Sequence, residues 1–187
     1  LGERYIKLRV NYDDDKIVNQ ADWNEGKEKE MREEITALIM GFLTNLELNE
    51  NIIFMEEQKN QIKLLAKFIA KLRTPISSQF VGDEIVVDIK PQSEKPTRLY
   101  KQLKKLAICL CNIESRASFD DEFYEILKRV ARDTCPQDRL MVMDFFNENN
   151  ERFYENDLVR KLKMPRTSLQ RLLWALYRLE ILEREVE

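Results

Sequence analysis

The chain has 187 residues, of which 43% are hydrophobic, and its formal net charge is −3. This length allows one large domain or two small ones, with enough apolar residues to bury a core. The chain contains no histidine, which excludes histidine ligands to zinc and Ser-His or Cys-His nucleophile pairs. No apolar run approaches the roughly 18 to 20 residues of a membrane span, so we expect a cytoplasmic protein without a membrane partner.

The three cysteines are an odd number and do not make a disulfide framework, so we expect reduced thiols. Charge is distributed unevenly. From Arg160 to Arg178 there are six basic residues and no acidic one, whereas Asp144 to Asp157 holds five acidic residues and one arginine. A net negative charge argues against indiscriminate binding of polyanions, but this tract concentrates basic charge where a recognition helix is expected.

The N-terminal part of the chain predicts a strand followed by two helices. Residues 1–12 are typical of a strand that leads into a turn, and a short helix is expected to follow to about Trp23. From Glu25 onward, apolar residues recur at the spacing of an amphipathic helix. The members of this stripe are Met31, Ile35, Leu38, Ile39, Phe42, Leu43 and Leu46.

Three further helices are expected before residue 134. The first covers residues 55–73 and ends before Pro75, and residues 76–92 are expected to form a loop or a small hairpin. The second begins at Pro96, whose fixed φ suits a first helical position, and runs to about Asn112. The third is expected to be capped by Ser118 and to end near Asp133. Its expected buried residues are Phe123, Ile126, Leu127 and Val130.

Residues 135–187 have the order of elements typical of a winged helix-turn-helix domain. Helices are expected at 136–147, 155–162 and 166–179, with the turn Lys163-Met164-Pro165 before the last one and a short strand possible at 152–154. Such a domain presents one helix end to the major groove, and arginine, glutamine and hydroxyl side chains bind bases and phosphates. The residues expected to contact DNA are Lys163, Arg166, Thr167, Ser168, Gln170 and Arg171.

An alternative interpretation is a helical protein-interaction domain whose basic residues only solvate its surface. Trp174 is interpreted as a packing residue rather than as a platform for base stacking. The sequence predicts no metal site.

The residues Thr97, Arg98, Leu99 and Leu103 at the start of the 96–112 helix resemble the lid of AAA+ ATPases, especially minichromosome-maintenance helicases and related replication helicases of phages and mobile elements. The resemblance implies that Arg98 is the sensor-2 arginine. The segment Leu65 to Pro75 is similar to the helix-then-proline element of that family. Gly2-Glu3-Arg4-Tyr5 is similar to its Ser-Arg-Phe-Asp element, which would make Arg4 the arginine finger, although Ile6 stands where the family has aspartate.

The resemblance implies a mainly α fold, with a helical AAA+ lid-like domain at 1–134 followed by a winged helix-turn-helix domain at 135–187. The strand at 1–12 would belong to the ATPase core. The chain has no Gly-x-x-x-x-Gly-Lys-Ser/Thr phosphate loop, so it should not hydrolyse ATP alone and needs no cofactor by itself. The resemblance therefore implies a C-terminal part of a larger homo-oligomeric, hexameric motor that uses ATP and Mg²⁺ and binds DNA.

Two other functions remain open. One is a non-enzymatic transcription regulator whose N-terminal helices dimerise or sense a ligand while its C-terminal domain binds an operator. The other is a module of a replication complex that contacts protein through its winged helix.

Overall fold

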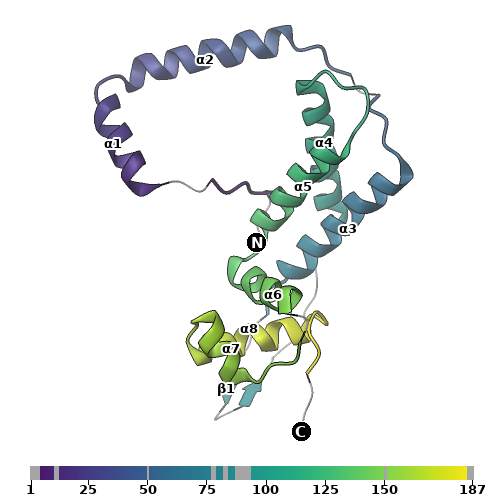
Figure 1. The fold of residues 1–187 in the computed structure, drawn as a ribbon. Coiled ribbons are helices and arrows are strands. Elements are labelled where there is room, and N and C mark those ends of the chain that lie inside the picture. The colour runs from purple at the N-terminus through teal and green to yellow at the C-terminus, as the bar shows by residue number, and fades with distance from the viewer. Residues whose placement is uncertain are drawn as a thin grey trace.

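The computed structural model describes residues 5–10, 13–49, 51–76, 79–81, 84–86, 94–149 and 151–184. The fold is mainly helical, as expected (Figure 1). Its elements are α1 (Asp14–Asn24), α2 (Glu28–Asn45), α3 (Glu56–Leu72), β1 (Gln79–Val81), β2 (Glu84–Val86), α4 (Thr97–Ile113), α5 (Asp121–Thr134), α6 (Gln137–Asn149), α7 (Glu155–Leu162) and α8 (Arg166–Arg178).

Helices α3, α4 and α5 pack against one another. Each contributes one apolar side, because its apolar residues recur every three or four positions. Ile126 was expected in this core but is 38% exposed, since it lies at the edge of the apolar side of α5. The buried residues of this cluster include Ile62, Ala66, Ile69, Leu99, Leu103, Ala107, Phe123, Leu127 and Ala131.

The N-terminal end of α5 is capped by Asp120 rather than by Ser118. The Asp120 side chain accepts a hydrogen bond from the Phe123 backbone N–H at 3.1 Å. This bond lowers the pKa of the Asp120 carboxyl, as does the guanidinium of Arg116, which forms an ion pair with it. The helix therefore begins later than the sequence suggested, and Ser118 lies before the cap.

Helices α6, α7 and α8 form a second three-helix cluster. Its buried residues include Leu140, Val142, Leu158, Leu169 and Leu176. The bounds of α7 and α8 agree with the sequence prediction to within one residue. Residues 151–184 contain no strand, so neither the short strand expected at 152–154 nor a wing of strands is present in this described range.

The two clusters are joined at the C-terminal end of α3. Arg139 of α6 donates from Nη1 to the carbonyl oxygens of Leu72, at 2.5 Å, and Thr74, at 2.8 Å. Lys71 donates from Nζ to the Glu180 carbonyl oxygen at 3.0 Å. The carbonyl of Leu72, the last residue of α3, has no partner within the helix, and Arg139 supplies one. Together the two cations bring α6 and the residues after α8 to the end of α3.

Residues 5–10 run alongside the end of α5 without pairing to another strand, so the expected strand at 1–12 is wrong for this described part. The backbone N–H of Lys7 donates to Thr134 Oγ1 at 2.8 Å, and that of Arg9 donates to Asp133 Oδ2 at 2.9 Å. Side chains of α5 therefore take the place of a neighbouring strand. Residues 1–4 and 11–12 lie outside the described ranges.

Helices α1 and α2 form an arm that extends away from the two clusters (Figure 1). Neither helix contains a buried residue. The apolar stripe predicted for α2 is present, but most of its side chains are exposed, with Leu38 at 66% and Phe42 at 48%, while Met31 and Leu46 are half-buried. Helix α2 is therefore not stabilised by burial within this chain.

Residues 79–86 include the small hairpin that the sequence allowed as one of two possibilities. Strands β1 and β2 pair antiparallel, with Phe80 opposite Ile85.

Candidate nucleic-acid interface

Helix α8 is positioned by a tight turn after α7. Lys163 ends α7 in a left-handed conformation, with φ of 51° and ψ of 36°, and Pro165 follows as the residue before α8. The left-handed residue reverses the chain direction, and the fixed φ of proline suits a helix start. This turn packs α7 against α8 and leaves the N-terminal end of α8 at the surface.

The residues predicted to contact DNA all lie at this end of α8 or in the turn before it. Leu169, Leu172 and Leu176 hold the helix against α6 and α7 on its inner side. Of the predicted residues, Lys163, Arg166, Thr167, Ser168 and Arg171 are exposed and Gln170 is half-buried. The structure therefore brings together all six predicted residues.

Glu155, the first residue of α7, faces this group. Its Oε1 accepts from Arg166 Nε at 2.9 Å and from Gln170 Nε2 at 2.8 Å. One carboxylate therefore holds two predicted DNA-contact residues in place and adds negative charge beside them. Glu155 is not among the residues predicted from the sequence, because its neighbours in space are eleven and fifteen positions away in the chain.

The positive end of α8 is not compensated by acidic residues of its own first turn. Helices α1, α2, α3, α5, α6 and α7 each carry at least one acidic residue in the first turn. The free N–H groups and the dipole of a helix N-terminus favour an anion. Together with Arg166 and Arg171, this end of α8 is chemically suited to a phosphate group.

Other basic residues nearby have structural partners. Lys161 places its ammonium group over the ring of Phe153 at 4.5 Å and over that of Phe145 at 5.6 Å. These cation–π contacts tie α7 to the aromatic residues of α6 and of the segment before α7. Trp174 is half-buried and makes an edge contact with Tyr177, with ring centroids 5.7 Å apart, in agreement with a packing role.

The two residues assigned to nucleotide chemistry by resemblance are not brought together by the described residues. Arg98 lies in the first turn of α4 and forms an ion pair with Glu94, and its side chain is 45% exposed. Arg4 lies outside the described ranges. The roles of both arginines therefore stay predictions.

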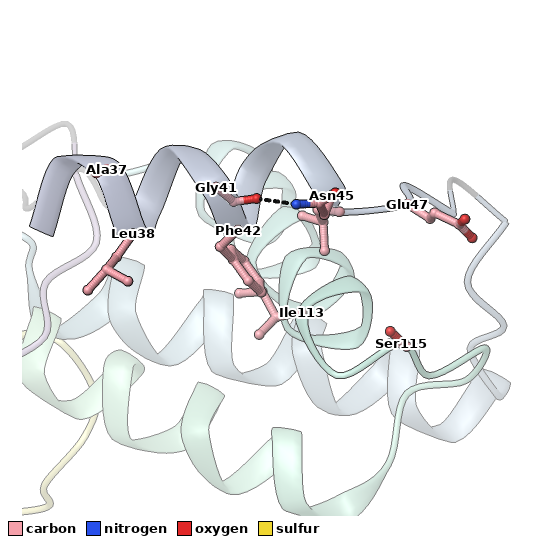
Figure 2. Close-up of a pocket in the computed structure, with 9 residues that line it drawn as sticks. Ala37, Leu38, Gly41, Phe42, Asn45, Glu47, Ile113 and Ser115 are labelled. Carbon is pink, nitrogen blue, oxygen red and sulfur yellow. Dashed lines mark hydrogen bonds between the residues drawn. The ribbon is translucent and has the colours of Figure 1, made fainter. Parts of the chain in front are cut away.

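A pocket of about 610 Å³ lies between the C-terminal half of α2 and the end of α4 (Figure 2). Leu38 and Phe42 of α2 and Ile113 of α4 make its apolar part. Its polar side chains, which are Asn45, Glu47 and Ser115, offer neither a nucleophile with a base nor a charge pair. Within the described ranges no cluster of three or more acidic or cysteine side chains is arranged to hold a metal ion.

None of the described helices has the length and apolar composition to cross a bilayer. Comparison of the chain with protein-family models, with curated proteins and with solved structures finds no match.

Proposed function

We propose that the chain is the DNA-binding C-terminal part of an ATP-dependent replication protein of the helicase or initiator type. The observation that carries the DNA-binding part is the exposed group at the start of α8, where Arg166 and Arg171 accompany the hydroxyls of Thr167 and Ser168. Arginine binds phosphate or guanine with two donors, and hydroxyls near a helix start suit phosphate oxygens.

The group at the start of α8 is tested by titrating a labelled DNA duplex with the chain and following fluorescence anisotropy at several salt concentrations. Arg171→Gln should weaken binding and lower the slope of log affinity against log salt by about one unit, because one phosphate contact is lost. Arg32→Gln is the matched control, since Arg32 is exposed on α2, far from α8, and the change removes the same charge.

Absence of binding at low salt would overturn the DNA-binding proposal. An equal loss of DNA affinity in Arg171→Gln and Arg32→Gln would show that only the net charge of the chain matters. That result would also contradict a binding site at α8.

The motor part of the proposal rests on the resemblance of Thr97, Arg98 and Leu99 to the AAA+ lid. Arg98 lies in the first turn of α4 with its side chain 45% exposed, and a permanently charged planar guanidinium can stabilise charge on a transferred phosphate. It would have to leave Glu94 to do so. The phosphate loop and the metal ligand for ATP and Mg²⁺ would come from the rest of the replication protein, in a hexamer.

In a protein that joins this chain to a phosphate loop, Arg98→Ala should depress ATP turnover and leave DNA affinity intact. Lys101→Ala is the control, because Lys101 is exposed one turn later on α4. Undiminished turnover in Arg98→Ala would remove the sensor role without affecting the assignment of α8.

A second candidate function is a transcription regulator that dimerises through its N-terminal helices. The observation that favours it is the exposed apolar side of α2, which contains Leu38, Ile39 and Phe42. Sedimentation of the isolated chain separates the two functions. A stable dimer that Phe42→Glu dissociates favours the regulator, whereas a monomer that binds DNA favours the motor part.

A further inference from the structure

Four lysines form a row along α3. Lys59, Lys63, Lys67 and Lys71 recur every four residues and therefore lie on one side of the helix, which we call the α3 lysine row. The buried core residues of α3 lie mainly on the adjoining side of the helix, and Lys59 and Lys71 are themselves half-buried. The sequence contains no acidic residue from Gln58 to Gly82, so nothing within this tract neutralises the row.

Among the described residues, the ion pairs of the α3 lysine row lie at its N-terminal end. Glu56 lies 3.1 Å from Lys59 Nζ and 3.7 Å from Lys63 Nζ, and its hydrogen bond with Lys59 lowers the pKa of its carboxyl. Among the described residues no carboxylate pairs with Lys67. The uncompensated charge of the row therefore lies toward the C-terminal end of α3, which faces the second cluster.

The α3 lysine row meets α8 at this end. Lys71 Nζ donates to the carbonyl oxygen of Glu180 at 3.0 Å, and Glu180 lies two residues after Arg178, the last residue of α8. Thr167, Arg171 and Arg178 are exposed and, at spacings of four and seven residues, share one side of α8. The acid-free tract of α8, which runs from Leu158 to Leu179, is thus joined in space to the acid-free tract of α3.

We propose that the α3 lysine row is a second phosphate-binding surface for the DNA that α8 contacts, and that Arg178 is the end of the α8 surface that lies toward the row. This inference rests on the proposed function of α8. Ammonium groups on flexible stems suit contact with the phosphate backbone and carry no sequence information. The row would therefore add affinity and orient the duplex, while α8 contacts the base edges.

The dimensions of the two helices set the length of DNA required. At 1.5 Å per residue, Lys59 to Lys71 and Arg166 to Arg178 each span about 18 Å. Because DNA rises 3.4 Å per base pair, each surface covers about five base pairs. A duplex of about six base pairs can engage α8 alone, whereas one of about 16 base pairs can reach both surfaces.

The test compares salt dependence of binding on a hairpin duplex of about six base pairs and on a duplex of about 16 base pairs. Lys63→Gln combined with Lys67→Gln should lower the salt slope on the long duplex by about two units and leave the short duplex unaffected. Lys16→Gln combined with Lys29→Gln is the control. Those lysines are exposed on the α1–α2 arm, and each also pairs with a carboxylate of its own segment.

If the two double variants lower the salt slope on the long duplex equally while binding to the short duplex is retained, the second surface is overturned. The proposed function of α8 would then still stand. Absence of wild-type binding to both duplexes would overturn the function of α8 and the second surface together. If the α3 double variant lowers the salt slope more on the short duplex than on the long one, the claim that a short duplex binds α8 alone is contradicted.

Discussion

Arg139 Nη1 lies 2.8 Å from the carbonyl oxygen of Thr74, a residue that is only 1% exposed. The same nitrogen also donates to Leu72, so one side chain of α6 completes the end of α3. Arg139 is half-buried, and burial lowers the pKa of its guanidinium. The relative position of the two three-helix clusters depends on this contact.

Replacing Arg139 with methionine should lower the free energy of unfolding by about 2 kcal/mol, because two buried carbonyl groups lose a charged donor. The methionine keeps much of the apolar stem, so packing is little altered. Urea denaturation measures the change. Arg129→Met is the control, since the Arg129 side chain is 64% exposed and should contribute less than about 0.5 kcal/mol. If Arg139→Met lowers the unfolding free energy as little as Arg129→Met does, the role of Arg139 in joining the two helix clusters is contradicted.

Cys135 gives the junction between α5 and α6 a dependence on pH. Burial raises the pKa of the Cys135 thiol to about 12, from an ordinary value of 9.0, and Sγ donates to the Ala131 carbonyl oxygen at 3.2 Å. The unfolded chain therefore loses this proton at lower pH than the folded protein does. The stabilising contribution is complete below about pH 9 and is lost as pH rises toward about 12.

Relative to Cys135→Ala, the wild-type protein should therefore lose about 1 kcal/mol of unfolding free energy between about pH 8 and about pH 10. Denaturant titrations of both proteins at each pH measure the difference, which removes the contributions of other groups that titrate in this range. If the unfolding free energies of the two proteins change with pH in parallel, the raised pKa of the Cys135 thiol is contradicted.

Glu155 should oppose DNA binding, because its carboxylate holds Arg166 and Gln170 and repels phosphate. Glu155→Gln keeps the size of the side chain and removes its charge, so affinity for DNA should rise about threefold to tenfold at low salt. Anisotropy titration measures the gain. The control is Glu148→Gln, which removes an exposed carboxylate near the end of α6. Weaker binding by Glu155→Gln would mean that Glu155 aligns Arg166 for DNA.

Most helices could be predicted from the sequence because their limits are local. The spacing of Leu158 and Leu162 indicates α7, and Pro165 fixes the start of α8. The cap of α5 was wrongly assigned to Ser118, because a serine and an aspartate two residues apart can both begin a helix. Only the bond from Phe123 to Asp120 separates the two possibilities.

Features that depend on distant partners could not be predicted from the sequence. The alternation of Ile6, Leu8 and Val10 with polar residues is typical of a strand, yet Thr134 and Asp133 accept the backbone hydrogen bonds in place of a neighbouring strand. The periodicity of α2 predicts an apolar stripe. It does not predict whether another part of the protein covers that stripe. In the candidate site, exposure of the α8 residues followed from the leucine spacing, whereas the bridge by Glu155 depends on how α7 lies against α8.

The most direct test of DNA contact by α8 is to map backbone amide chemical shifts of the isotopically labelled chain while a DNA duplex is added. We expect the largest changes from Lys163 to Arg171, with much smaller changes in α1 and α2. Changes confined to the arm or to α5, or the absence of any change at a DNA concentration that saturates the anisotropy signal, would contradict binding through the N-terminal end of α8.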